Sequence, residues 1–273
     1  MAVLSAGRRR WRGLLERASL DAQRAVERVA ADGKRSTYVG TGASGDRTLL
    51  ADKKAEEAIL GGMSGVPGLR ILSEEAGERG PSDSELLAIV DPLDGSSNYS
   101  HGIPFYCASV GVLDGRGLAS LRVALVRNLV NGDVYYAEKG KGATKNGLRI
   151  STSRVADIHT AVAGADLSRT SRRGVERQAG LVSSVARQVH LGANALELCL
   201  LAEGAIDLVV DSRGRARVVD FAGGGLIAKE AGAVITTPQG GALAPPISMT
   251  SRFDFVASAN PELHRKALSA LRS

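Results

Sequence analysis

The sequence predicts an α+β fold in two subdomains, and three observations lead to this prediction. Apolar side chains recur at helical spacing in residues 11–32 and again from about residue 48 to 59, apolar runs alternate with turns in residues 104–140, and helical and strand-like segments alternate after that. The first two patterns indicate helices packed on an antiparallel meander, and the third indicates αβ units. We place the boundary between residues 152 and 153, so the subdomains cover 1–152 and 153–273.

The N-terminal half begins with helical patterns. Leucine, alanine and valine recur at helical spacing in residues 11–32, which we predict to be a helix. Residues 33–48 are rich in glycine and serine without any period, which predicts a long mobile loop. A second helix is expected to begin near Thr48 and to carry Asp52.

Strand patterns follow in the same half. Short apolar runs predict strands at residues 69–77 and 85–95, and each run ends in acidic residues. The antiparallel meander occupies residues 104–140, and Asn131-Gly132 within it predicts a hairpin turn.

The C-terminal half alternates strands and helices. Gly232 is expected to cap a helix at its C-terminus, and Pro261 to stand in the first turn of the last helix. Predicted strands cover 160–168, 205–211, 233–238 and 253–259, and predicted helices cover 169–188, 194–204, 218–232 and 261–273.

Composition narrows the class of protein and of partner. The chain is 44% hydrophobic and 23% charged, as in ordinary globular proteins, and its net charge of +6 favours an anionic partner, either nucleic acid or a small anionic substrate. We interpret the basic cluster Arg8-Arg9-Arg10-Trp11-Arg12 as a solvated helix start. Two isolated cysteines, no signal-peptide pattern and no apolar run of about 20 residues predict a cytoplasmic location without membrane contact.

The acids at the strand ends are the candidate functional residues. Glu74 closes one predicted strand and Asp91 the next, and Asp94 follows after a tight turn. Such a cluster is tolerable where it binds cations, and oxygen ligands favour Mg²⁺, Mn²⁺ or Ca²⁺. Gly95 and Ser96 then begin a predicted helix, whose free N–H groups could bind phosphate. Taken singly, these signals also fit a turn, a helix cap or a solvated surface.

The order of three motifs resembles the inositol monophosphatase superfamily of magnesium-dependent, lithium-sensitive phosphatases. The motifs are Glu74-Glu75, then the segment "DPLDGS" at 91–96, then "DFAGGG" at 220–225 followed by Glu230-Ala231-Gly232. The resemblance implies a layered αβαβα sandwich of the sugar phosphatase type. Val219 stands where the family has an aromatic residue, so the packing behind Asp220 is expected to differ.

The resemblance also implies a metal site with two or three Mg²⁺ ions, or Mn²⁺ in their place. Two ions would share Asp91, and a third, weaker ion would lie near Glu74. The implied ligands are the side chains of Glu74, Asp91, Asp94, Asp220 and Asp46 and the backbone carbonyl of Leu93.

Roles in catalysis and phosphate binding follow from the same resemblance. Gly95 and Ser96 would bind the phosphate through their N–H groups, and the Ser96 hydroxyl, paired with Asp52, would orient the attacking water. Glu74 is counted with Asp52 and Ser96 as a catalytic residue. The loop 33–46 would close over the site.

The chain looks most like the archaeal-type members that act on both inositol monophosphate and fructose 1,6-bisphosphate. We therefore expect a small phosphorylated sugar or polyol as substrate. Alternatives within the superfamily are a phosphatase of 3′-phosphoadenosine 5′-phosphate or of NADP. Candidate substrate-binding residues are Asp94, Asp211, Arg169, Arg187 and Arg213.

Partners other than the substrate are less constrained by the sequence. The resemblance implies a homodimer. A non-catalytic RNA-binding regulator on the same fold is the alternative from another functional class, motivated by the basic pI and the arginine cluster. We do not expect nucleic acid as a partner, because a scaffold without catalysis has no use for a costly cluster of acids.

Overall fold

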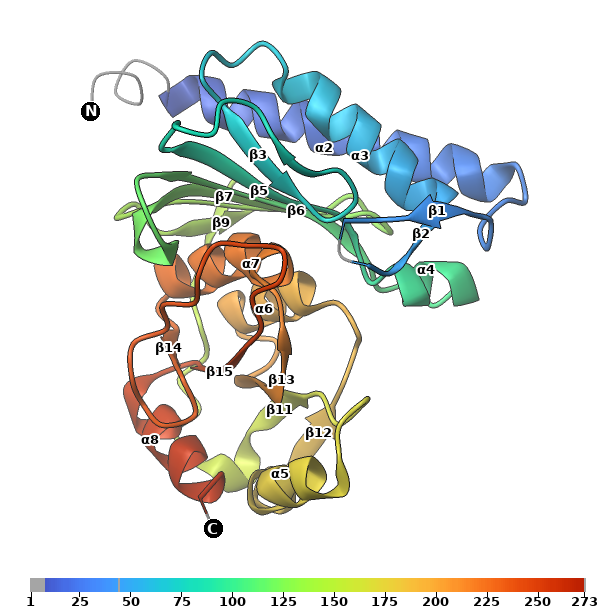
Figure 1. Ribbon diagram of the computed structural model, residues 1–273. Coiled ribbons are helices and arrows are strands. Elements are labelled where there is room, and N and C mark those ends of the chain that lie inside the picture. The colour runs from blue at the N-terminus through green and yellow to red at the C-terminus, as the bar shows by residue number, and fades with distance from the viewer. Residues whose placement is uncertain (1–7, 44, 273) are drawn as a thin grey trace.

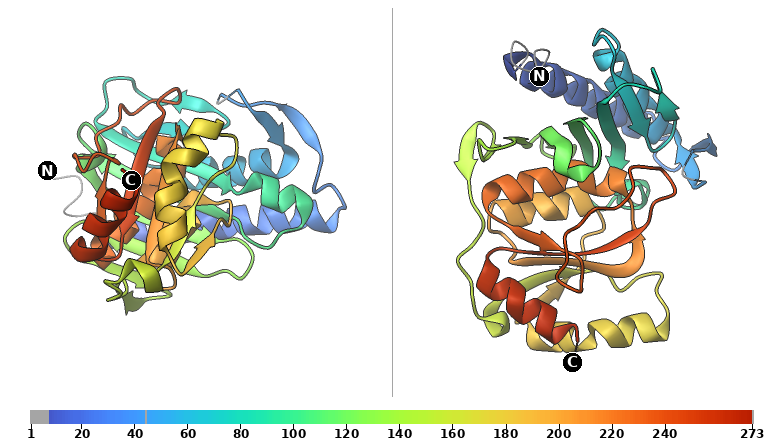
Figure 2. Two further views of the ribbon diagram at one scale, coloured as in Figure 1. Left: turned by 90° about the horizontal axis from the view of Figure 1, so that it is seen from below. Right: turned by 60° about the vertical axis from the view of Figure 1, so that its left-hand side comes forward.

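The computed structural model describes residues 8–43 and 45–272 of the chain. Its elements stack in five layers that alternate helices with sheets (Figure 1). The layers are a helix pair, an eight-stranded sheet, a second helix pair, a five-stranded sheet and a last helix pair, and the right-hand view of Figure 2 shows the same order from another side. The predicted layered αβαβα sandwich is therefore confirmed.

The eight-stranded sheet contains the meander and has the strand order β10-β9-β8-β7-β6-β5-β3-β4. Its strands β3 and β5 are parallel neighbours, which brings their C-terminal ends to one edge, and its other pairs are antiparallel. The strands are β3 (Arg70–Ser73), β4 (Gly77–Arg79), β5 (Leu86–Asp94), β6 (Cys107–Asp114), β7 (Leu121–Asn128), β8 (Val134–Glu138), β9 (Ala143–Lys145) and β10 (Leu148–Ile150).

Helices α2 (Arg8–Ala31) and α3 (Leu50–Met63) cover the outer face of this sheet (Figure 1). Their apolar sides and the sheet enclose one hydrophobic core, in which Ile59 of α3 is fully buried. Because α3 is held by this core, the residue Asp52 in its first turn has a fixed place at the end of the sheet. Helix α2 includes the basic cluster from Arg8 on, but Trp11 within it is buried in the core and not solvated, and the side chains of residues 8–10 lie outside the described part.

The five-stranded sheet belongs to the C-terminal half and has the strand order β12-β11-β13-β15-β14. Helices α5 (Arg172–Ser184) and α8 (Pro261–Ala270) lie on its far side (Figure 1). The strands are β11 (Val162–Ala165), β12 (Arg187–Val189), β13 (Leu208–Ala216), β14 (Val234–Thr236) and β15 (Phe253–Ser258).

Helices α6 (Asn194–Ala202) and α7 (Val218–Ala231) form the central layer between the two sheets (Figure 2). The glycines of α7 allow this close packing. A Cβ on Gly223 would collide with the Ser109 hydroxyl of β6, and a Cβ on Gly224 would lie 2.5 Å from the Ala195 carbonyl of α6. The small-residue run after Asp220 therefore serves to press the start of α7 against the first sheet.

The structure corrects the predicted loop 33–48. A short antiparallel hairpin, β1 (Tyr38–Thr41) with β2 (Arg47–Leu49), occupies most of that segment. Tyr38, Val39 and Thr41 are residue types that favour strands, but the surrounding glycines hid their pattern.

Several elements of the C-terminal half differ in length from the prediction, and two of these differences have a clear cause. The helix predicted at 169–188 ends at Ser184, because residues 187–189 pair in parallel with β11. The strand predicted at 205–211 begins at Leu208 and continues to Ala216. Both differences arise from pairing with distant strands, which local periodicity does not contain.

Several local signals are confirmed. Gly132 has φ 81° in the turn between β7 and β8, and Gly232 has φ 114° as the C-cap of α7. Pro261 begins α8 after the N-cap Asn260. The expected boundary at 152 and 153 falls in the segment that joins the two sheets, between β10 and β11. None of the helices described is both long enough and apolar enough to cross a membrane.

Candidate active site

The first two acids meet because their strands are parallel neighbours. Ser73 of β3 is paired with Val90 of β5, and the next N–H, that of Glu74, donates to the Val90 carbonyl at 3.3 Å. Glu74 and Asp91 therefore follow equivalent positions of adjacent strands. The expectation that the two strand ends lie side by side is confirmed.

A β-bulge at Pro92 and Leu93 places Asp94 with Asp91. In a regular strand, residues three apart point to opposite faces of the sheet. Here Asp91 is paired with Ser109 and Asp94 with Cys107, two residues apart on β6, so one extra residue is inserted on β5. Both carboxylates consequently face the central helices. The proline suits this bulge because it has no N–H to leave unpaired.

The third acid comes from the central layer. Asp220 is the third residue of α7, and carboxylate oxygens of Glu74, Asp91 and Asp220 all lie within 4.8 Å of one another. Asp91 is completely buried, and its Oδ2 has no hydrogen-bond partner among the described residues. Such an oxygen is costly unless a cation is bound to it. An all-oxygen donor set fits Mg²⁺, Mn²⁺ or Ca²⁺.

Electrostatics in this cluster reflect burial and mutual repulsion. The pKa of Glu74 is raised to about 7, chiefly by burial; the charge of Arg217 opposes this rise and the charge of Asp220 adds to it. Burial and the neighbouring acids raise the pKa of Asp91 and of Asp94 well above the usual range of a carboxyl. The protein surroundings therefore stabilise less negative charge than the fully ionised acids of this cluster would carry.

Asp94 lies beside this group and also contacts the central helices. Its Oδ2 accepts a hydrogen bond from the N–H of Ala195, at the start of α6, at 2.7 Å. The Leu93 N–H donates to Asp91 Oδ1 at 3.1 Å, which orients the buried carboxylate. These hydrogen bonds from backbone N–H groups fix the positions of the Asp94 and Asp91 carboxylates.

Among the described residues one basic side chain enters the cluster, and it was not one of the predicted site residues. Arg217, the N-cap of α7, donates from Nη1 to Glu74 Oε1 at 2.5 Å and from Nη2 to Asp220 Oδ1 at 2.7 Å. Its Nε lies 3.0 Å from Asp220 Oδ2. The basic residue three positions before the acid, at a helix start, is the one signal that could have indicated this pair.

Asp52 approaches from the opposite layer, on α3. The Leu49 N–H donates to Asp52 Oδ2 at 2.8 Å, just as the Arg217 N–H donates to Asp220 at 3.3 Å, so both acids close the first turn of their helices. Burial raises the pKa of Asp52 to about 8, with contributions from Glu75 and Glu74. Among the described residues no hydrogen bond joins Asp52 to Ser96, and their pairing stays a prediction.

The candidate phosphate-binding segment begins α4 (Ser96–His101). Gly95, not a serine, is the N-cap, with φ 90°, and a Cβ there would lie 2.9 Å from the Phe105 carbonyl. Only glycine fits this left-handed turn in so little space. Gly95 and Ser96 directly follow Asp94, so the anion-binding role predicted for their N–H groups would act beside the acids.

The β1–β2 hairpin contacts the site through Glu75. The Ala43 N–H donates to the Glu75 carbonyl at 3.0 Å, and the Thr48 hydroxyl donates to its carboxylate. Asp46, on this hairpin, has a side chain that is 71% exposed and lies 3.7 Å from Arg217 Nη1. The predicted loop acid thus does stand next to the cluster, on its solvent side.

A second charged group lies in the middle of β13. Arg213 binds both oxygens of Asp211, with Nη2 at 2.7 Å from Oδ2 and Nε at 2.9 Å from Oδ1, and its Nη1 pairs with Asp166. Because Asp211 is buried and bound by Arg213, its first task in this structure is to hold that arginine. Its predicted contact with sugar hydroxyls stays a prediction.

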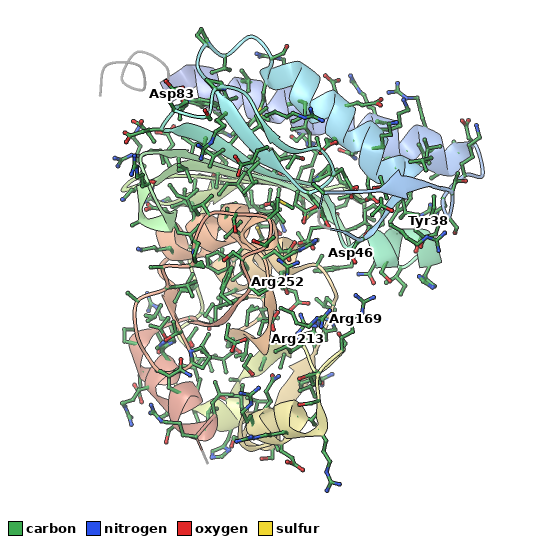
Figure 3. All side chains as sticks on the ribbon, viewed as in Figure 1. Tyr38, Asp46, Asp83, Arg169, Arg213 and Arg252 are labelled. Atoms are coloured by element: carbon green, nitrogen blue, oxygen red, sulfur yellow. The ribbon has the colours of Figure 1, made fainter. Side chains whose placement is uncertain are left out.

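The two remaining candidate arginines are exposed. Figure 3 shows Arg169 beside Arg213, with Asp46 across the junction of the two halves. Arg169 has φ 49° in the segment between β11 and α5, and its neighbour Ser168 accepts a hydrogen bond from Arg213 at 3.1 Å. Arg187 lies on the edge strand β12, where it is exposed.

Three comparisons with known proteins agree with this geometry. A profile of the inositol monophosphatase family matches residues 13–273. The fructose-1,6-bisphosphatase/inositol-1-monophosphatase of Methanothermobacter thermautotrophicus is 34% identical over 273 residues, which cover 96% of this chain and 96% of that protein. The bifunctional NADP phosphatase/NAD kinase of Methanococcus maripaludis is 30% identical, over 90% of this chain and 46% of that protein.

The same relationship is seen among solved structures. A Pyrococcus horikoshii protein described as having similarities to inositol-1 monophosphatase superimposes with a TM-score of 0.83 at 29% identity. The match covers 96% of this chain and 98% of that one.

Proposed function

The chain belongs to the inositol monophosphatase family, and we propose that it is a metal-dependent phosphomonoesterase of small phosphorylated sugars and polyols. One observation supports this proposal above the others. Oxygens of Glu74, Asp91 and Asp220 converge within 4.8 Å, and the buried Oδ2 of Asp91 has no partner among the described residues. The family is metal-dependent, and this donor set fits a divalent cation.

The acids would hold the metal, with Mg²⁺ as the proposed ion. We assign Glu74, Asp91, Asp94 and Asp220 as ligands, with the Leu93 carbonyl and Asp46 as further donors. A divalent ion bound there neutralises phosphate charge and lowers the pKa of a bound water. The bulge at Pro92 and Leu93 serves this role because it keeps two ligands on one face of the sheet.

Phosphate would be held by backbone donors next to the acids. Gly95 and Ser96 present N–H groups at the start of α4, and the N–H of Ser96 cannot bond within a helix that begins with it. The Ser96 hydroxyl and Asp52 would orient the attacking water. With its pKa raised to about 8, Asp52 can retain or accept a proton near neutral pH, as a general acid–base requires.

The substrate class follows from the relatives and the junction residues. The relative that covers 96% of the chain is a fructose-1,6-bisphosphatase/inositol-1-monophosphatase, and we propose the same two substrates here. NADP is the second candidate, because a bifunctional NADP phosphatase/NAD kinase also matches, over 46% of its own length. Arg169 is exposed at the junction and is the cation best placed for a second phosphate.

The test is phosphate release in the presence of Mg²⁺ by the Asp94→Asn protein and by a matched control. We expect activity on inositol 1-phosphate or fructose 1,6-bisphosphate to fall by about 10³-fold in Asp94→Asn, because the variant removes the charge of a ligand. Asp83→Asn is the control, since Asp83 is exposed and lies far from the site (Figure 3). Full activity of Asp94→Asn would contradict the proposal.

A substrate panel separates the candidates. It contains inositol 1-phosphate, fructose 1,6-bisphosphate, 3′-phosphoadenosine 5′-phosphate and NADP at equal concentration. If kcat/KM were highest for NADP, then NADP would replace the sugar phosphates as the proposed substrate. The expected homodimer is a separate proposal, which light scattering of the purified protein tests.

A further inference from the structure

Arg217 stands where the metal ligands converge, and this placement has a chemical consequence. Its guanidinium bridges Glu74 and Asp220 at 2.5 and 2.7 Å, and these are two of the three residues whose oxygens lie within 4.8 Å of one another. The side chain is 17% exposed, so water screens the contacts poorly. A divalent cation bound by the same oxygens would be repelled by the guanidinium.

We propose that Arg217 is a built-in counter-ion of the acidic cluster that a divalent metal displaces on binding. The inference rests on the proposed metal site. In the metal-free protein Arg217 limits the repulsion between the acids, and on metal binding it gives up Glu74 and Asp220. Metal binding is therefore an exchange of one cation for another, and the arginine lowers the apparent affinity for the metal.

The charge balance explains why the exchange favours the metal. One guanidinium faces four carboxylates, those of Glu74, Asp91, Asp94 and Asp220, and it contacts only the first and the last. Asp91 Oδ2 stays without a partner among the described residues. A divalent ion reaches this buried oxygen and brings twice the charge. The cluster thus binds Arg217, but this contact leaves the buried Oδ2 of Asp91 without a partner in the part of the chain that the structure describes.

A nearby acid, Asp46, could form an ion pair with the displaced side chain of Arg217. Asp46 lies 3.7 Å from Arg217 Nη1 on the solvent side, with 71% of its side chain exposed. With two ions bound and the third, weaker ion absent, rotation toward the β1–β2 hairpin would carry the guanidinium away from Glu74 and Asp220 and pair it with Asp46. The hairpin, which the family resemblance assigns to metal binding, would then respond to occupancy of the site.

The test compares Arg217→Gln with Arg213→Gln in protein stripped of metal by a chelator. Mg²⁺ or Mn²⁺ is titrated by calorimetry, and thermal unfolding is recorded with and without the ion. We expect Arg217→Gln to bind the ion about 10-fold tighter than the unchanged protein and to lose Tm chiefly in the absence of metal. Arg213→Gln, a similarly buried arginine that also pairs with two acids, should lower Tm equally in both conditions and leave metal affinity unchanged.

Equal or weaker metal binding by Arg217→Gln would overturn the exchange. If no form of the protein bound a divalent ion, the proposed metal dependence would fail as well, so the two failures are distinguishable. A second measurement does not depend on that variant folding. The Arg217 side-chain N–H signal, assigned by its loss in Arg217→Lys, should shift as Mg²⁺ is added to the unchanged protein. A signal that stays constant while Mg²⁺ binds would also overturn the proposal.

Discussion

Two arginines of this protein sit between buried acids, and their surroundings differ. Arg213 pairs with Asp211 and Asp166, and its side chain is 10% exposed. Arg217 pairs with Glu74 and Asp220 and is 17% exposed. Both form forked contacts with carboxylates. Both belong to the C-terminal half and lie where it meets the N-terminal half.

The difference lies in how many acids each arginine faces. Around Arg213 the two oxygens of Asp211 both have donors, and Asp166 is further bonded by the Ser168 N–H at 2.7 Å. Around Arg217 the additional acid Asp91 keeps an oxygen without a partner among the described residues. A balanced ion-pair group holds a fold together, whereas a surplus of acids prepares a site for a cation.

The largest expected effect comes from removing one of the surplus acids around Arg217, namely Asp91. Asp91→Asn should reduce phosphatase activity by about 10³-fold, because a metal-supplied effect of several kcal/mol is lost. The metal-free variant should at the same time keep the Tm of the unchanged protein, since burial and the neighbouring acids raise the pKa of Asp91 and already favour its neutral form. A variant that loses activity and also loses metal-free stability would show that Asp91 is needed for the fold, contrary to the comparison.

Breaking the balanced group should affect stability without regard to metal. Arg213→Gln leaves Asp211 and Asp166 unpaired in a buried place, which should lower the free energy of unfolding by about 3 kcal/mol. Urea unfolding with and without Mg²⁺ measures this change. A loss that disappears when Mg²⁺ is added would place Arg213 in the metal site.

A buried acid outside both arginine pairs should make stability depend on pH. The pKa of Asp52 is raised to about 8 in the folded protein, from 3.8 for the unperturbed group, so the folded state retains a proton that the unfolded state has lost. The free energy of unfolding should therefore fall by up to ~1.4 kcal/mol per pH unit as pH rises from about 4 to about 8, and level off above.

Asp52→Asn provides the control for this pH dependence. The amide oxygen can still accept from the Leu49 N–H, but the side chain no longer titrates. In metal-free protein the variant should show a shallower fall of stability over the same pH range. An unchanged slope in the variant would show that other groups, such as Glu74, cause the dependence.

The smallest expected effect concerns an acid that needs no cation. Glu230, in the third motif, accepts hydrogen bonds from the N–H groups of Gly140, Lys141 and Gly142 at 2.9 to 3.1 Å. Glu230→Gln should lower the free energy of unfolding by about 1 kcal/mol, because the bonds to a charged acceptor weaken. Phosphate release should be unchanged, and a large loss of activity would be inconsistent with this purely structural role.

Much of the fold could be predicted because its signals are local. Helical spacing, the Asn131-Gly132 turn and the Gly232 cap each depend on a few adjacent residues, and all three are confirmed. The β1–β2 hairpin and the strand β12 were missed because they form by pairing, β12 with a strand more than 20 residues away in the chain. Pairing of that kind leaves no periodic trace in the paired segment.

The site shows the same limit. The convergence of Glu74 with Asp91 follows from two adjacent strand ends, which the sequence displays directly. The unpartnered oxygen of Asp91 and the contact of Arg217 with Glu74 depend on how the two halves meet, and the only sequence signal was the place of Arg217 three residues before Asp220. Likewise, the pairing of Asp211 with Arg213, two residues further along β13, was not predicted, and a contact of Asp211 with substrate stays a prediction.

The most direct test of the central claim is phosphate release by chelator-treated protein before and after Mg²⁺ is restored. The substrates are inositol 1-phosphate and fructose 1,6-bisphosphate. The acidic cluster predicts no release above background in the chelator and full release once Mg²⁺ is present in excess. Release that continues unchanged in the chelator would contradict a metal-dependent phosphatase built on Glu74, Asp91 and Asp220.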